Sequence, residues 1–200
     1  MDPYVYPGTN VLRNLRDIRD AAQLSQAEAI ATTRRITELE LKPVRGRFDV
    51  RHLQAIHRYI FQDVYDWAGQ FRTVNISKSC DPFAFHEHIV SYLTNTFAEL
   101  KRENHLAAAD LQQFANRAAY YLGEINAVHP FREGNGRTQR EFIRELSVRR
   151  GFELNWSRIS QPQMIEASRR SLRRDNIGLE ELLTAALDTE QNRRLPLFRG

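Results

Sequence analysis

The sequence is poor in cysteine, glycine and proline, and it has no long apolar run. Cys80 is the one cysteine among 200 residues, so no disulfide can form within the chain, which agrees with a reducing cytosol. No stretch is apolar for long enough to cross a bilayer, and the first residues lack the basic and apolar regions of a secretory signal. Nine glycines and seven prolines are too scattered for a long linker. These absences predict one soluble, cytoplasmic domain over residues 1–200 without membrane contact.

What the sequence does contain is a mixture of apolar and charged residues that suits a folded domain. Apolar residues make up 42% and charged residues 27%, which is enough for a buried core without disulfides. The formal net charge is +4. Such a balance attracts acidic partners of several kinds, including nucleotides, nucleic acids and acidic proteins, and by itself it does not choose among them.

Apolar residues recur at three- and four-residue intervals over most of the chain, which is the spacing of amphipathic helices. Residues 71–77 alternate apolar and polar side chains instead, so we expect a short β-hairpin within about 71–85. The expected fold is therefore all-α, a bundle of about eight helices with one hairpin and a core at about 49–190. The tail from Gln191 to Gly200 could lead into a further domain. The expected helices cover residues 24–41, 50 to about 66, 86–102, 110–128, 137 to about 150, 161–173 and 179–189.

Most of the candidate functional residues lie between His129 and Arg140. A His-Pro pair ends one helix there, because proline disfavours helical geometry in the residue before it, and Gly134-Asn135-Gly136 opens the next helix. Glycines at a helix N-terminus leave backbone N–H groups available, and the helix dipole adds partial positive charge, so phosphate binds at such places. Arg137 and Arg140 are three residues apart in the first turn, so both side chains can reach the same anion.

Three further side chains complete the chemistry of this loop. Glu133 would repel phosphate unless a cation lay between them, and Mg²⁺ bound by carboxylate and phosphate oxygens supplies that cation. His129 suits the role of general base, since histidine has an ordinary pKa near ~6.5. Phe131 can sink into the core and act as a structural anchor for the loop. Together these residues predict a phosphoryl-type transfer that works by positioning and charge neutralisation.

The loop differs from the common nucleotide-binding loops, and its full sequence is more specific than its parts. No Gly-x-x-x-x-Gly-Lys-Ser/Thr P-loop occurs, and the Gly-x-Gly-x-x-Gly turn of dinucleotide-binding folds would follow a strand. The run HPFREGNGRTQR, from His129 to Arg140, resembles the complete signature of Fic proteins, His-Pro-Phe-x-Asp/Glu-Gly-Asn-Gly-Arg-x-x-Arg. The resemblance implies a Fic fold and a protein adenylyltransferase, which moves AMP from ATP to a protein hydroxyl.

The same resemblance implies a role for each residue of the loop. His129 would deprotonate a Ser, Thr or Tyr hydroxyl of a target protein, which attacks the α-phosphorus of ATP while pyrophosphate leaves. Glu133 would hold Mg²⁺. The nucleotide would be bound by Gly134, Asn135 and Gly136 at the α- and β-phosphates, and by Arg137 and Arg140 at the outer phosphates.

Other parts of the chain extend the resemblance to short bacterial Fic toxins. Asp2-Pro3-Tyr4 and Asp66-Trp67-Ala68-Gly69 are similar to segments of those toxins. The expected hairpin at about 71–85 resembles the flap of the family, which docks an extended target segment by strand addition. Lys78 resembles the flap lysine that contacts the nucleotide.

Regulation is implied by a motif that the chain lacks. Fic proteins restrained in cis carry Ser/Thr-x-x-x-Glu-Gly/Asn, whose glutamate blocks productive ATP binding. The Glu-Gly and Glu-Asn pairs here are Glu133-Gly134 and Glu103-Asn104, and neither glutamate has Ser or Thr four residues earlier. We therefore expect Arg137 to be free to bind ATP, and a separate small antitoxin with such a helix to restrain the enzyme. Known toxins of this group modify the ATPase subunits of bacterial type II topoisomerases, which makes such a subunit the expected target in a bacterial cytoplasm.

Two alternatives stay open. A Fic enzyme could transfer another group, such as UMP, phosphocholine or phosphate, although the intact Gly134-Asn135-Gly136 argues against phosphate transfer. A basic nucleic-acid-binding module without catalysis is the alternative from another class. The arginine pairs of the sequence are dispersed over polar helix faces, so we expect no direct binding to nucleic acid.

Overall fold

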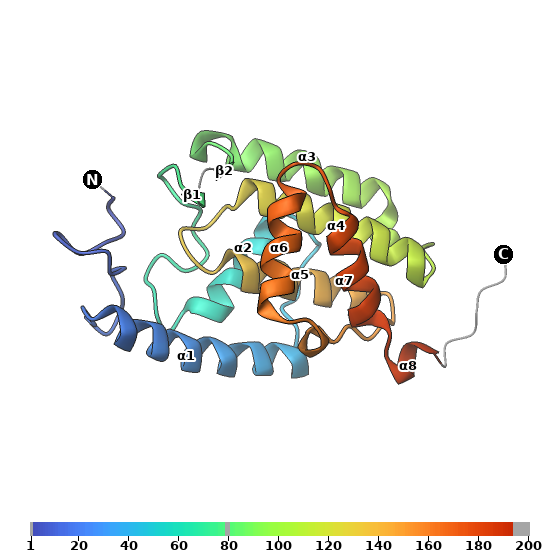
Figure 1. Ribbon diagram of the computed structural model, residues 1–200, viewed down its shortest axis with the longest axis horizontal. Coiled ribbons are helices and arrows are strands. Elements are labelled where there is room, and N and C mark those ends of the chain that lie inside the picture. Colours follow the sequence, from blue (N-terminus) through green and yellow to red (C-terminus); the bar gives the residue numbers. More distant parts are fainter. Residues whose placement is uncertain (1, 79–80, 194–200) are drawn as a thin grey trace.

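The computed structural model describes residues 2–78 and 81–193, apart from the side chains of Lys78, Asp81 and Arg193, and it shows a helical bundle (Figure 1). Within these residues the predicted all-α fold of about eight helices is confirmed. The α-helices are α1 (Ala21–Leu41), α2 (Val50–Phe61), α3 (Ile89–Arg102), α4 (Leu111–Val128), α5 (Asn135–Arg149), α6 (Gln161–Ser171), α7 (Ile177–Leu187) and α8 (Glu190–Arg193). Short 3-10 helices are η1 (His86–His88), η2 (Asn104–Leu106) and η3 (Trp156–Arg158).

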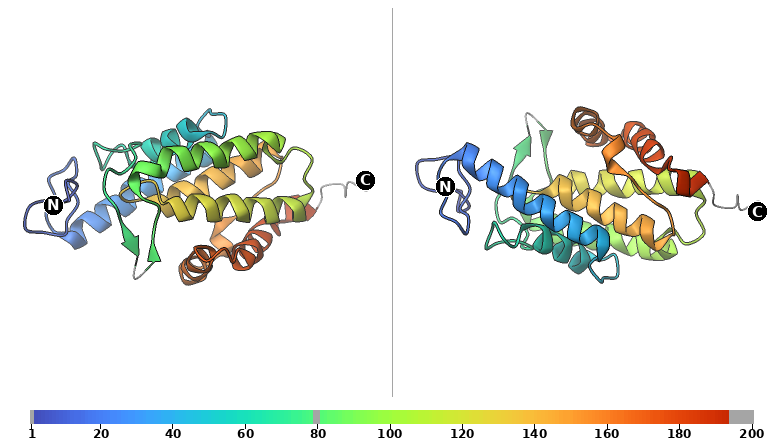
Figure 2. Two further views of the ribbon diagram at one scale, coloured as in Figure 1. Left: turned by 90° about the horizontal axis from the view of Figure 1, so that it is seen from above. Right: turned by 90° about the horizontal axis from the view of Figure 1, so that it is seen from below.

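Helices α4 and α5 form the centre of the bundle. Helix α4 packs against α3, α5, α6 and α7, while α2 packs against α5 and α1 lies on α2 (Figure 2). Phe114, Tyr121 and Ile125 of α4 are fully buried at helical spacing, and Phe142 of α5 is fully buried as well. Each such side chain contributes about 1.5 to 3 kcal/mol when it leaves water, so burial along α4 and α5 fixes how the two helices meet.

The junction between α4 and α5 follows from the local sequence. A capping box opens α4: the Asp110 carboxylate accepts the Gln113 N–H at 2.8 Å, and the Gln113 side chain accepts the Asp110 N–H at 3.1 Å. His129 ends α4 in the left-handed conformation, as Pro130 requires an ending at this point. Helix α5 begins at Asn135 rather than at Arg137, with Gly134 as its N-cap. The end of α4 and the start of α5 therefore meet at residues 129–134.

The β-hairpin is much smaller than predicted. Strands β1 (Ser77–Lys78) and β2 (Asp81–Pro82) pair antiparallel, with Ser77 opposite Pro82 and Lys78 opposite Asp81. The alternating residues 71–76 form no strand, so the prediction of strand structure there is wrong.

Arg72 explains why residues 71–76 stay out of a strand. This arginine is 2% exposed, and its backbone N–H donates to the Pro130 carbonyl at 2.9 Å. The segment is therefore tied to the loop after α4 instead of to a partner strand. The guanidinium donates to four backbone carbonyls, those of Val74, Ala84, Val128 and His129.

No helix in the described part of the chain combines the length and the apolar character needed to traverse a bilayer. Of the tail that could lead into a further domain, residues 194–200 lie outside the described residues, so that expectation stays a prediction.

Replacing Asp110 with alanine should destabilise the fold without changing the site. The variant loses the acceptor for the Gln113 N–H at the start of α4, which lowers the free energy of unfolding by about 1 kcal/mol. Urea unfolding followed by circular dichroism measures the difference. Gln26→Ala, at an exposed position of α1, is the control and should shift the free energy by less than about 0.5 kcal/mol. Equal stability of Asp110→Ala and Gln26→Ala would contradict the role of the capping box.

Candidate active site

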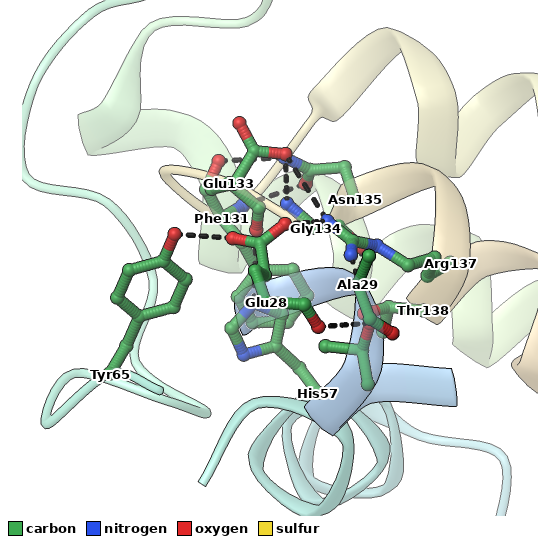
Figure 3. Close-up of polar contacts among 11 residues, drawn as sticks. Glu28, Ala29, His57, Tyr65, Phe131, Glu133, Gly134, Asn135, Arg137 and Thr138 are labelled. Atoms are coloured by element: carbon green, nitrogen blue, oxygen red, sulfur yellow. Dashed lines mark hydrogen bonds and ion pairs between the residues drawn. The ribbon is translucent and has the colours of Figure 1, made fainter. Parts of the chain in front are cut away.

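The loop at residues 129–134 is held by the side chain of Asn135 (Figure 3). This amide accepts the Phe131 N–H at 2.9 Å and donates to the Phe131 carbonyl at 2.8 Å. Phe131 is fully buried, as expected for an anchor, and its ring stacks on His57 at 3.8 Å between ring centroids. The side chain of Asn135 thus shapes the loop, and its contribution to a nucleotide would come from the backbone.

Gly134 occupies a place that only glycine can fill. Its φ is +79°, and a Cβ atom there would lie 2.1 Å from the ring of Phe61 on α2. The backbone at the N-terminus of α5 can therefore lie directly against α2. Among the described residues no side chain caps the start of α5, although the Gly134 N–H itself donates to Glu133 Oε1 at 2.8 Å. An uncapped helix N-terminus is suited to bind phosphate.

His57 is a residue of the site that sequence reasoning missed. In the sequence it is one member of an apolar helical face, with no sign of a polar role. In the structure its Nδ1 accepts the Gly69 N–H at 2.8 Å, and its Nε2 lies 3.0 Å from the Glu133 carbonyl. These partners suit a neutral ring with the proton on Nε2. Burial lowers the pKa of His57 to about 3, so the ring remains neutral while it holds the backbone of Glu133.

Glu133 presents a carboxylate where a metal ion could be held. Its side chain is 46% exposed, and Oε1 lies 3.7 Å from the Arg137 guanidinium. No group of three or more His, Cys, Asp or Glu residues that could hold a metal occurs in the described part of the chain. This donor set fits Mg²⁺, which is commonly bound by one carboxylate together with phosphate oxygens and water, and does not fit a metal held by protein ligands alone.

His129 faces the same region from the end of α4. Its φ of +47° is uncommon for a residue with a side chain, and this conformation turns the chain sharply out of the helix. Nδ1 lies 3.3 Å from the Asn126 carbonyl, and a proton on Nδ1 would leave Nε2 as the basic nitrogen. The ring stacks on Phe83, which follows β2, with centroids 3.8 Å apart and planes 12° apart. The candidate base is thus fixed on one face by the hairpin region.

Arg137 is paired within the chain, a contact that the sequence did not predict. Its binding to ATP stays a prediction. Its Nη2 lies 2.6 Å from Oε1 of Glu28, and its Nη1 donates to Thr32 Oγ1 at 3.1 Å (Figure 3). Both partners belong to α1, and the guanidinium also lies over the ring of Phe61 at 4.7 Å. The Tyr65 hydroxyl donates to the second oxygen of Glu28. No inhibitory motif marks Glu28 in the sequence, because it lies in an ordinary amphipathic helix 109 residues before Arg137.

Arg140 has a different environment from Arg137. Among the described residues no acceptor forms a hydrogen bond or ion pair with its guanidinium. Burial, and then the charge of Arg137, lower the pKa of Arg140. Two guanidinium groups from one helical turn thus line the same cavity, and of the two only Arg137 is neutralised by a carboxylate among the described residues.

One cavity of about 640 Å³ gathers most of the predicted site residues. Its volume is in the range of small-molecule and cofactor sites. Beyond the loop it is lined by residues of α4, η3 and α6, including Trp156 and Met164. The predicted site residues that line it are His129, Glu133, Gly134, Asn135, Gly136, Arg137 and Arg140. The side chain of Lys78 lies outside the described residues, so its contact with a nucleotide stays a prediction.

Replacing Gly134 with alanine should damage both the fold and the site. The added Cβ requires a strained φ and displaces Phe61, which together lower the free energy of unfolding by about 2 to 4 kcal/mol. Gly151→Ala is a matched control, since Gly151 has a φ of +75° but nothing within 4 Å of the added atom. It should cost only the conformational strain, about 1 kcal/mol. Thermal unfolding of both variants separates strain from clash, and equal losses would contradict the close approach of α2.

His57 predicts an acid-dependent loss of stability. Its pKa is lowered from 6.5 to about 3 in the folded protein, so below pH 6.5 the unfolded chain binds a proton that the folded chain does not. The contribution of the neutral His57 ring to stability is complete above pH 6.5. It falls as the pH drops towards 3, by about 1.4 kcal/mol per pH unit for one proton. His57→Gln should lose this part of the slope in urea unfolding between pH 6.5 and 4. His88→Gln, at an exposed position, should follow the wild type. An unchanged slope in His57→Gln would contradict the neutral, buried ring.

Comparisons with known proteins agree with the geometry of the loop. A model of the Fic/DOC family matches residues 47–146. Protein adenylyltransferase VbhT of Bartonella schoenbuchensis is 40% identical over 204 aligned residues, which cover 100% of this chain and 42% of that protein. "Probable protein adenylyltransferase y4lH" of Sinorhizobium fredii is 41% identical over 175 residues, covering 87% of this chain and 90% of that protein. The chain thus spans less than half the length of VbhT and most of the length of y4lH.

Among solved structures, the BepC protein of Bartonella tribocorum with bound AMPPNP is similar to this chain, with a TM-score of 0.87 and 25% sequence identity. The match covers 92% of this chain and 95% of that one. AMPPNP is an analogue of ATP, so a protein of the same fold holds an adenine nucleotide. The chain belongs to the Fic/DOC family.

Proposed function

We propose that this chain is a protein adenylyltransferase that moves AMP from ATP to a Ser, Thr or Tyr hydroxyl of a target protein. One observation carries the proposal: a single cavity is lined by a candidate base, a candidate metal carboxylate and the uncapped start of α5. Transfer of AMP from ATP to a hydroxyl requires these groups together, because the phosphates must be bound and neutralised while the acceptor loses its proton. The names of the relatives VbhT and y4lH, and the nucleotide bound to BepC, support the same activity.

Different residues of the cavity bind different parts of ATP. The backbone N–H groups of 134–136 donate to the α- and β-phosphates at the helix N-terminus. Arg140 binds an outer phosphate, which supplies the anion that its half-buried guanidinium lacks among the described residues. Glu133 holds Mg²⁺, which supplies charge neutralisation at the phosphates when it is bound. The side of the cavity lined by Trp156 and Met164 offers apolar surface for the rest of the nucleotide.

His129 performs the proton transfer. It takes the proton of the acceptor hydroxyl, the acceptor oxygen forms a bond to the α-phosphorus, and the bond from that phosphorus to pyrophosphate breaks. The ring is already oriented by Phe83 and by the Asn126 carbonyl, so no large rearrangement is needed to place the basic nitrogen.

The hairpin region aligns the acceptor. An extended segment of the target adds as a strand beside β1, and Lys78 contacts the nucleotide at the same time. The proximity of this region to the base supports the proposal, because Phe83 directly follows β2 and stacks on His129.

Regulation and target follow from the family resemblance. A small antitoxin with a Ser/Thr-x-x-x-Glu-Gly/Asn helix restrains the enzyme in the bacterial cytoplasm, and an ATPase subunit of a type II topoisomerase is the target. The lack of that motif in this chain supports an inhibitor supplied by another protein.

His129→Ala should abolish transfer from labelled ATP. Pure protein, Mg²⁺ and a bacterial lysate are incubated with ATP labelled at the α-phosphate, and loss of the base should reduce labelling by about 10² to 10⁴. His88→Ala, which removes an exposed histidine, is the control and should label as the wild type does.

The position of the label separates the alternatives. Label from the α-phosphate on a protein, with the mass of AMP, supports the proposal. Transfer of the γ-phosphate, or a mass of UMP or phosphocholine, would replace it with another Fic activity. Salt-dependent DNA affinity that survives His129→Ala, without any transfer, would favour the nucleic-acid-binding module.

A further inference from the structure

We infer that Glu28 of α1 is a positioning residue that holds Arg137 away from the metal carboxylate Glu133. The inference rests on the proposed function, since it gives Glu133 the role of holding Mg²⁺. Helix α1 lies outside the residues that match the family model, which are 47–146. The chain thus completes its site with a residue from beyond the matched segment.

The contacts of Arg137 define where its charge is neutralised. Glu28 Oε1 lies 2.6 Å from Nη2, whereas Glu133 Oε1 lies 3.7 Å from the same nitrogen (Figure 3). The shorter contact is also the more buried one, because the Glu28 side chain is 13% exposed and that of Glu133 is 46% exposed. Arg137 therefore pairs with Glu28 and lies only near Glu133.

Glu28 is itself fixed in place. The Tyr65 hydroxyl donates to its second oxygen, and burial beside the Glu28 carboxylate raises the pKa of Tyr65, which keeps that donor protonated. The Tyr65 ring stacks on Trp67 with centroids 4.3 Å apart. Thr32, one turn after Glu28 on α1, binds the other end of the guanidinium at 3.1 Å. Arg137 is thus held by a preformed set of partners on α1.

The position of Glu28 argues against a competitor for ATP. A carboxylate that blocked the nucleotide would have to occupy the space of a phosphate. Arg137 and Glu133 line the cavity, whereas Glu28, Thr32 and Tyr65 are not among its lining residues. Because Glu28 is not among the residues that line the cavity, it can pair with Arg137 while a phosphate chain is bound.

Loss of Glu28 would redirect Arg137. Without its partner the guanidinium has the Glu133 carboxylate within reach, at 3.7 Å, and a direct pair between them would compete with Mg²⁺ for that carboxylate. The consequence is specific to the metal: the enzyme would need more Mg²⁺ before ATP could bind productively.

Glu28→Gln tests this inference through the dependence on Mg²⁺. The concentration of Mg²⁺ that gives half-maximal labelling from ATP should rise by roughly 10- to 100-fold, as it does when supporting residues of metal sites are removed. Labelling at saturating Mg²⁺ should recover. Glu28→Asp keeps the charge and should fall between the wild type and Glu28→Gln. Glu40→Gln, which removes an exposed carboxylate from the same helix, is the matched control and should match the wild type.

Three further measurements test the same inference independently. The Mg²⁺ dependence of AMPPNP binding, measured by calorimetry, should shift in the same way, and it tests the inference even if no acceptor is ever labelled. On an Arg137→Ala background, Glu28→Gln should have no additional effect, because Glu28 acts through Arg137. Tyr65→Phe, which loses only the hydroxyl, should raise the Mg²⁺ requirement in the same direction and serves if Glu28→Gln does not fold.

The outcomes separate this inference from the proposed function. Labelling that is higher in Glu28→Gln than in the wild type would make Glu28 a competitor and overturn the inference. An unchanged Mg²⁺ dependence of labelling and of AMPPNP binding would overturn it as well. Absence of transfer by the wild type, with AMPPNP binding and its Mg²⁺ shift intact, would overturn the proposed function and leave the role of Glu28 supported.

Discussion

The two hydrogen bonds between the Asn135 side chain and the backbone of Phe131 hold the loop on which the site depends. The chain gives up helical hydrogen bonds where it leaves α4 at His129 and enters α5 at Gly134, and both residues have positive φ values. The Asn135 amide replaces part of what is lost, and Phe131 locks the turn into the core. The end of α4 therefore presents the candidate base, and the start of α5 presents its N–H groups, at a fixed separation.

The two arginines of the motif are chemically alike and electrostatically different. Glu28 neutralises Arg137, whereas Arg140 is half-buried and its pKa is lowered by burial and by the charge of Arg137. Leaving a guanidinium without an anion in such a place is costly, which supports the proposed binding of a phosphate by Arg140. In the proposed function, Glu133 then keeps its exposed carboxylate for Mg²⁺. Phosphate binding would thus be separated from metal binding, although Arg137 and Arg140 come from one helical turn.

The helices and the loop could be predicted from the sequence because their signals are local. Apolar spacing marks the helices, and the His129-Pro130 pair and the glycines mark the turn between two of them. The contacts that were missed join residues far apart in the chain. His57 binds the carbonyl of Glu133 across 76 residues, and Glu28 pairs with Arg137 across 109. The spacing of apolar residues does not predict such pairings. They arise only when α1 and α2 pack against α5, so even a complete family signature left the neutralisation of Arg137 undetermined.

Arg72 gives the physical reason why residues 71–76 form no strand, against the prediction. Its guanidinium donates to the Val74 and Ala84 carbonyls on the hairpin side and to the Val128 and His129 carbonyls on the loop side. Burial lowers the pKa of Arg72, which needs these acceptors because its charge is buried. The hairpin and the candidate base therefore share one set of hydrogen bonds. An acceptor held along the hairpin is held relative to His129 as well, which is the alignment that in-line attack on a phosphorus atom requires.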